Sequence, residues 1–113
     1  MSVADLARAY LGQGKFAGSE PLAREALEFR QRKQPNDWGR FCAESMLGAS
    51  LAGQSKYTEA ERPLLEGYQG MAARQHQPPE ARETSDLTGA RQWLAQMYTA
   101  WGNPEKAAEW KSK

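Results

Sequence analysis

Apolar residues recur along this chain at intervals of three and four residues, the spacing that places them on one face of an α-helix. Strand-forming residues are scarce, with one valine and no isoleucine, whereas alanine, leucine, glutamate, arginine and glutamine are abundant. These abundant residues are good helix formers. The pattern therefore predicts an all-helical chain, with helices over about residues 2–13, 17–33, 38–52, 58–77, 80–101 and 104–111.

Residues that cap or interrupt helices stand at the expected boundaries. Ser2 suits the N-cap of the first helix, and Gly14 suits the turn that follows it. The Pro-Asn-Asp segment at 35–37 predicts the end of the second helix. Pro21 is expected in the first turn of that helix, where a missing N–H is tolerated, and Pro63 predicts a kink or a late start in the fourth helix.

The helical segments also repeat one another in sequence. Three kinds of position recur, namely a leucine, a turn residue and a small residue in the next helix: Leu6, Leu47 and Leu94; Gly14, Ser55 and Gly102; Ser19, Ala60 and Ala107. The turn residues are 41 and 47 residues apart. Repetition at about 20 to 50 residues indicates a stack of similar units, which presents a binding surface.

Small residues occupy one shared position in the first helix of each unit, namely Ala7, Gly48 and Ala95. Because small side chains let neighbouring helices approach closely, we expect these residues where two helices touch. Two tryptophans, Trp101 and Trp110, flank the last turn. We expect them to seal the C-terminal end of the core.

Composition and charge narrow the function classes. The chain has 113 residues, a net charge of +1 and a mean hydropathy of −0.82. Basic and acidic residues are interleaved, which disfavours nucleic-acid binding. No apolar run has the length of a signal peptide or a membrane span, and Cys42 is the single cysteine. We therefore expect a cytoplasmic location, unless the chain is part of a larger anchored protein.

The candidate catalytic and metal-binding residues are few. His76 is the only histidine, and it and Cys42 lie in different predicted helices, so neither a zinc site nor a nucleophile pair is expected from them. Glu80, Glu83 and Asp86 lie at helical spacing and are expected to form a solvated helix face. The sequence thus predicts no enzyme activity, no metal site and no cofactor.

The repeated residues resemble the tetratricopeptide repeat, in which a first helix with Leu-small-x-x-Tyr is followed by a Gly-x-aromatic turn and a second helix with small residues. The first repeat carries Leu6, Ala7, Tyr10, Gly14, Phe16, Ser19 and Ala26. The second carries Leu47, Gly48, Leu51, Tyr57, Ala60 and Gly67, and the third carries Leu94, Ala95, Tyr98, Gly102 and Ala107. The second repeat departs from the pattern with Ser55 at the turn glycine, and the third with Pro104 at the aromatic position.

The long spacing resembles a particular variety of this family. The period exceeds the usual length of about 34 residues and is similar to that of kinesin light chains and many bacterial repeat proteins. Residues 26–38, 57–68 and 100–110 also resemble the C-terminal arrays of bacterial membrane-associated serine/threonine kinases. No kinase motif is present here, so such an enzyme part would lie outside this chain.

The resemblance implies an all-α fold in which antiparallel helical hairpins stack as a right-handed α-solenoid. We expect a single domain over residues 1–113, with hairpins at about 2–34, 38–77 and 80–112 and the last hairpin short. It further implies a protein or peptide ligand held in a concave groove lined by the first helix of each hairpin. The groove positions carried over from the family are Ala4, Arg8, Leu11, Ser45, Ala49, Ala52, Gln92, Gln96 and Thr99.

Helical spacing places all nine of these residues off the core stripes, so we expect them to be exposed. Arg8 is the candidate for a ligand carboxylate, and the glutamines are candidates for pairing with a peptide backbone. Trp93, beside the third leucine stripe, is expected to be partly exposed and to touch a partner. The lysines and asparagines of the carboxylate-clamp subtype are missing, which excludes its chaperone ligands.

A second interpretation is structural. No polar capping helix precedes Ser2, and the sixth helix is short, so the ends of the stack are expected to expose apolar surface. Such ends favour a homodimer or a scaffold segment within a larger, signalling protein. The mass of the protein in solution distinguishes this interpretation from ligand binding.

Overall fold

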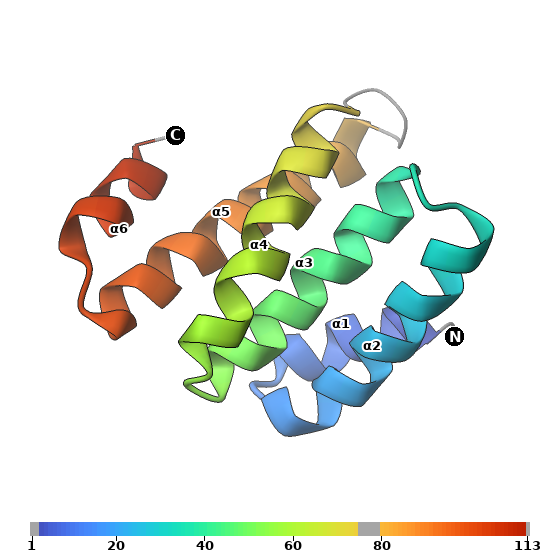
Figure 1. The fold of residues 1–113 in the computed structure, drawn as a ribbon, viewed down its shortest axis with the longest axis horizontal. Coiled ribbons are helices and arrows are strands. Elements are labelled where there is room, and N and C mark those ends of the chain that lie inside the picture. Colours follow the sequence, from blue (N-terminus) through green and yellow to red (C-terminus); the bar gives the residue numbers. More distant parts are fainter. Residues whose placement is uncertain (1–2, 75–79, 113) are drawn as a thin grey trace.

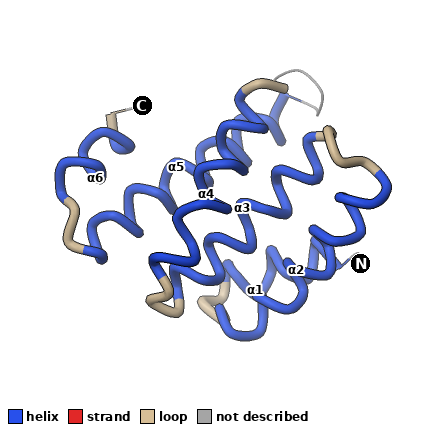
Figure 2. Tube along the Cα trace, viewed as in Figure 1, coloured by secondary structure: helices blue, strands red, loops and turns tan. Residues whose placement is uncertain are grey.

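The computed structural model describes residues 3–74 and 80–112, but not the side chains of residues 80–85. Every regular element in this described part is a helix (Figures 1 and 2). The helices are α1 (Val3–Gly12), α2 (Phe16–Lys33), α3 (Trp38–Gly53), α4 (Tyr57–Ala72), α5 (Glu80–Trp101) and α6 (Pro104–Lys111). The all-helical prediction is therefore confirmed.

The helix bounds differ from the expected ones in a few places. The expected N-cap Ser2 lies outside the described residues. Because α2 begins at Phe16, Pro21 stands in its second turn rather than its first. The helix α4 begins at Tyr57 and continues through Pro63, so a late start is wrong. It ends at Ala72, where the sequence pattern predicted continuation.

The helices form antiparallel hairpins that stack side by side. Each helix packs on the next along the chain, and α3 also contacts α1 and α5. In Figure 1, α2 and α4 lie in front of the more distant α1 and α5, and α1 and α6 lie at opposite ends of the stack. Figure 2 shows the three hairpin turns toward one edge of the molecule. This is the architecture of a helical-repeat solenoid.

The small residues lie at helix contacts, as expected. Ala7 and Ala95 are buried, and Gly48 is buried against α4. A Cβ atom placed on Gly48 would lie 2.6 Å from Cγ of Leu64 and 2.8 Å from the Leu64 backbone nitrogen. On the facing helix, a Cβ atom on Gly67 would lie 2.8 Å from the backbone oxygen of Phe41. The backbones of α3 and α4 thus approach too closely for any side chain at these two positions.

The three hairpin turns share one conformation. The turn residues Gly14, Ser55 and Gly102 have φ angles of 73°, 64° and 86°. In each turn the following N–H donates to a carbonyl five residues earlier: Lys15 to Tyr10 at 2.9 Å, Lys56 to Leu51 at 3.0 Å and Asn103 to Tyr98 at 2.8 Å. This is the bond of a Schellman C-cap, which needs a left-handed residue that glycine supplies without strain. Ser55 adopts the conformation at a cost.

A carboxyl group is buried between α3 and α4. Glu44 is 5% exposed, and its Oε2 lies 3.7 Å from Nε of Arg40. Burial, followed by the influence of the neighbouring Glu66, raises the pKa of Glu44 to about 8. The pKa of Glu66 is lowered, because Glu44 and Arg62 both interact with its carboxylate. The pair therefore holds one proton at neutral pH.

We predict that Ser55→Gly stabilises the fold by about 0.5–1 kcal/mol. The left-handed conformation costs a non-glycine residue about 1–2 kcal/mol, and the greater freedom of glycine in the unfolded chain offsets part of that gain. Ser55→Ala is the matched control, since it removes the hydroxyl but keeps the strain. Thermal unfolding checks both variants, and a melting temperature of the glycine variant at or below that of the parent would contradict the prediction.

We predict that Glu44→Gln reduces the loss of stability as the pH rises from 5 to 8. In that window the folded protein retains a proton on Glu44 that the unfolded chain has released. The free energy of unfolding therefore falls as the pH rises, by up to about 1.4 kcal/mol per pH unit. The lowered pKa of Glu66 changes the free energy of unfolding only at more acidic pH.

Urea unfolding at pH 5, 6.5 and 8 measures this difference, with the exposed Glu28 on α2 as the control substitution Glu28→Gln. The amide of Glu44→Gln stays neutral at all three pH values. The free energy of unfolding of the variant, relative to that of the parent, should therefore be highest at pH 8. Parallel stability curves for parent and Glu44→Gln would show that Glu44 titrates normally.

Candidate functional site

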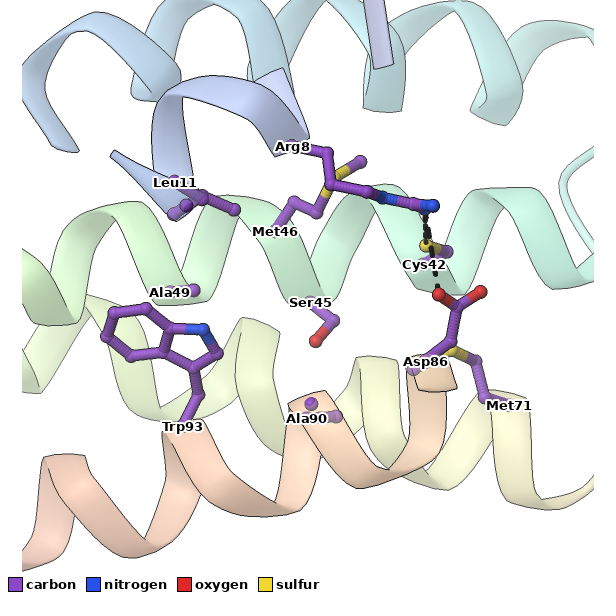
Figure 3. A pocket seen from close by; sticks show the side chains of 12 residues that line it. Arg8, Leu11, Cys42, Ser45, Met46, Ala49, Met71, Asp86, Ala90 and Trp93 are labelled. Carbon is purple, nitrogen blue, oxygen red and sulfur yellow. Dashed lines mark hydrogen bonds and ion pairs between the residues drawn. The ribbon is translucent and has the colours of Figure 1, made fainter. Parts of the chain in front are cut away.

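A pocket lies where the first helices of the three hairpins converge. Its volume is about 340 Å³, and Figure 3 shows the side chains that line it. The lining residues come from α1, α3 and α5, with one from α4: Arg8, Leu11, Gly12, Cys42, Ser45, Met46, Ala49, Met71, Asp86, Gly89, Ala90 and Trp93. We call this site the concave pocket.

Helical periodicity explains which residues reach the concave pocket. The α3 residues are spaced by three, four and seven positions: Cys42, Ser45, Met46 and Ala49. The α5 residues have the same spacing: Asp86, Gly89, Ala90 and Trp93. Each set forms one stripe on its helix. The small residues Ser45 and Ala49 on α3, with Gly89 and Ala90 on α5, leave the space, and the larger lining side chains bound it.

The polar end of the concave pocket is held by a carboxylate. Oδ1 of Asp86 lies 3.6 Å from Nη2 of Arg8, and Oδ2 of Asp86 accepts a 2.9 Å hydrogen bond from Nε1 of Trp38. The same Arg8 nitrogen donates to Sγ of Cys42 at 3.3 Å, as drawn in Figure 3. The side chain of Asp86 is only 8% exposed. It is therefore a structural carboxylate, and its expected place on a solvated face is wrong.

The other end of the concave pocket is aromatic and aliphatic. Trp93 lines it together with Leu11 and Ala49, and Figure 3 shows these three side chains on the side away from Arg8. The ring of Trp93 meets the ring of Phe16 edge-on, with centroids 5.5 Å apart. Since Phe16 begins α2, this contact joins the first and third hairpins. Trp93 is partly exposed, as expected.

The nine groove residues expected from the sequence do not all lie together. Arg8, Leu11, Ser45 and Ala49 line the concave pocket. Ala4 instead lines a separate cleft between α1 and α2, and Gln92 lines one between α5 and α6. The three remaining positions, Ala52, Gln96 and Thr99, line none of these pockets.

The expected exposure of the nine residues is wrong for the α3 members. Ser45, Ala49 and Ala52 are all buried, and Ala49 is 1% exposed. The reason is that helices surround α3, so its residues from Phe41 to Ala52 are all buried, including those on the concave side. Gln92, Gln96 and Thr99 are exposed as expected, although the hydroxyl of Thr99 donates to the Ala95 carbonyl of its own helix.

The structure also gives Arg8 an internal carboxylate, Asp86, whereas the resemblance to the repeat family led us to expect a ligand carboxylate at this residue. A ligand would have to compete with Asp86 for the guanidinium. No local sequence pattern indicates this pairing, because Arg8 and Asp86 are far apart along the chain and belong to different hairpins. Met46 and Met71 are both buried while lining the concave pocket.

The remaining candidate residues are Cys42 and His76. Cys42 is buried, and His76 lies outside the described residues. Among the side chains that the structure describes, no three histidine, cysteine, aspartate or glutamate residues are grouped as a metal site would require. No described helix combines the length and apolar composition needed to cross a bilayer.

The two tryptophans near the C-terminus differ in their surroundings. Trp110 meets the ring of Tyr68 edge-on, with centroids 4.9 Å apart, and so covers the junction of α4 and α6. Trp101 is 39% exposed and stacks on Tyr57 and Tyr98. The expected sealing role therefore fits Trp110, whereas Trp101 keeps a large open surface.

Comparison with known families gives one match. Residues 1–33 match the model of the family described as tetratricopeptide repeat. The matched segment contains α1 and α2, which form the first hairpin. No curated protein and no solved structure matches the chain. The match, together with three hairpins that share one turn geometry, supports a tetratricopeptide repeat family for this chain.

Proposed function

We propose that this chain is an interaction module that binds a protein or peptide through the concave pocket. The observation that carries the proposal is the convergence of all three first helices on this one pocket. The tetratricopeptide match over residues 1–33 supports a role in protein–protein interaction or scaffolding. The binding position and the ligand below are our own inference.

The chemistry of the concave pocket favours an apolar anchor on the ligand. Leu11, Met46, Met71 and Trp93 supply most of its large side chains. Methionine side chains adapt to differently shaped apolar groups, which suits a site for a short segment. The volume of about 340 Å³ is at the lower end of the range of about 300–1,000 Å³ that is typical of ligand pockets. We therefore infer that the pocket takes one or two side chains, not a long peptide.

The polar groups would set the orientation of the ligand. Arg8 and Asp86 at one end can pair with a backbone amide or a terminal charge, at the expense of their own ion pair. The exposed Gln92, Gln96 and Thr99 remain proposed contacts for ligand backbone outside the pocket. An apolar anchor with a polar neighbour is thus the ligand pattern that we expect.

We predict that Gly89→Leu abolishes ligand capture without harming the fold. Gly89 lines the concave pocket, and a Cβ atom placed on it meets no atom within 4 Å, so a leucine side chain would enter open space. Replacing a helical glycine also gains up to about 1 kcal/mol of helix propensity. Gly89→Ala is the matched control, because it gains the same propensity but fills little of the pocket.

The experiment selects binders from a random peptide library with the parent protein and then tests them on both variants. Binders that the parent and Gly89→Ala retain and Gly89→Leu loses would support the concave pocket as the binding site. Binders retained by Gly89→Leu, with an unchanged melting temperature, would overturn it. Ala49 also lines the concave pocket, but it is buried, so a bulky substitution there would disturb the fold.

Self-association is the second candidate, favoured by an apolar surface at the first hairpin. Phe29 is 52% exposed beside a cleft that Val3, Ala4 and Ala26 also line. If the library yields no binder, light scattering that gives the mass of a dimer would favour this function. The substitution Phe29→Glu should then restore the monomer.

We also propose that the chain belongs to the long-period variety of the family. The spacings of 41 and 47 residues between equivalent turn residues support this. A segment of a larger signalling protein, such as a bacterial serine/threonine kinase, is consistent with an interaction module of this kind. In such a protein the concave pocket would recruit the partner.

A further inference from the structure

A second cleft lies at the turn between α5 and α6, on another part of the molecule than the concave pocket. Its volume is about 270 Å³, and it is lined by Glu61, Tyr98, Trp101, Gly102, Asn103 and Lys106. Glu61 comes from α4, so the cleft joins the second and third hairpins. The proposed function makes no use of these residues.

Aromatic faces form one wall of this cleft. The rings of Tyr98 and Trp101 are within 7° of parallel, with centroids 6.3 Å apart. Tyr57 stacks on Trp101 from α4, at 5.8 Å between centroids, and fixes the indole in place. Trp101 nevertheless stays 39% exposed. An exposed aromatic face carries negative potential and attracts cations.

A carboxylate stands beside the aromatic wall. Oε2 of Glu61 accepts a 2.8 Å hydrogen bond from the hydroxyl of Tyr98. Burial, together with the hydrogen bond to Glu61, raises the pKa of Tyr98, so the hydroxyl remains a donor at physiological pH. This bond holds the Glu61 carboxylate at the rim of the cleft. The cleft therefore combines a carboxylate with the exposed aromatic surface of Trp101, while Tyr98 is buried behind it.

The cleft already holds a cation, which belongs to its own chain. Nζ of Lys106 lies 5.4 Å from the ring centroid of Tyr98 and 3.7 Å from Oε2 of Glu61. The Lys106 side chain is 52% exposed, and exposed ion pairs of this kind contribute at most about 1 kcal/mol. Lys106 can therefore leave the cleft at small cost.

We propose that this cleft is a binding site for an organic cation, namely the guanidinium or ammonium group of a basic side chain on a partner protein, which displaces Lys106. Trp101 offers exposed aromatic surface, and Glu61 supplies the counter-charge. Lys106 acts as an internal competitor that lowers the affinity. The site is independent of the concave pocket and does not require the proposed function to be correct.

The test titrates N-acetyl-arginine amide and N-acetyl-lysine amide into the protein and follows the indole N–H resonance of Trp101 by NMR. Trp101→Phe assigns that resonance among the four tryptophans. N-acetyl-citrulline amide, which is neutral but similar in shape to the arginine probe, is the ligand control. We expect both cationic probes to shift the resonance and the citrulline probe to leave it unchanged.

Two substitutions test the mechanism. Lys106→Met keeps the aliphatic stem but removes the internal cation, so it should tighten binding of the cationic probes by about fivefold. Glu61→Gln can still accept the Tyr98 hydrogen bond but loses the charge, so it should weaken binding by a similar factor. Lys111→Met changes the net charge equally on the same helix and does not line the cleft, which makes it the matched control.

Two results of these experiments would contradict the cation-binding proposal. Equal effects of Lys106→Met and Lys111→Met, or equal binding of the citrulline and arginine probes, would overturn it. Gly89→Leu, which fills the concave pocket, should leave the titration unchanged. Loss of peptide capture and loss of cation binding therefore report separately on the two sites.

Discussion

The close backbone contact between α3 and α4 is the constraint on which the rest of the structure depends. Gly48 and Gly67 allow it, since a Cβ atom at either position would overlap the facing backbone. With α4 this close and α2 on its other flank, α3 is buried from Phe41 to Ala52. A central helix without a solvent face then serves as the floor of the concave pocket, which explains why Ser45 and Ala49 are buried lining residues.

Two contacts across this floor distinguish the stack from a simple solenoid. In repeat architectures each unit mainly contacts its neighbours. Here Arg8 reaches Asp86, and Phe16 meets Trp93, so the first and third hairpins are also joined directly. The two contacts lie at opposite ends of the concave pocket. Its shape therefore depends on all three hairpins, and a ligand that separates Arg8 from Asp86 would also act on how the hairpins are held together.

Much of the fold could be predicted from the sequence because it depends on local rules. The stripe of apolar residues at helical spacing predicted all six helices, and the repeated turn position predicted where they reverse. That position has a positive φ in all three turns, even where Ser55 replaces glycine. Helix ends were less predictable, as Ala72 shows, because the sequence pattern alone does not fix where tertiary contacts stop supporting a helix.

The sequence by itself determined the helices, the turns and the small residues at which helices touch, since each follows from neighbouring residues and backbone geometry. Only the tertiary structure decided which residues share the concave pocket. Equivalent residues of the first two repeats are 41 apart, yet Cys42 and Ser45 line the pocket 34 residues after Arg8 and Leu11. Likewise Asp86 and Trp93 follow Cys42 and Ala49 by 44 residues and not by 47. Packed helices adjust along one another until their side chains interlock, so residues that are not equivalent in the repeat pattern can line one pocket.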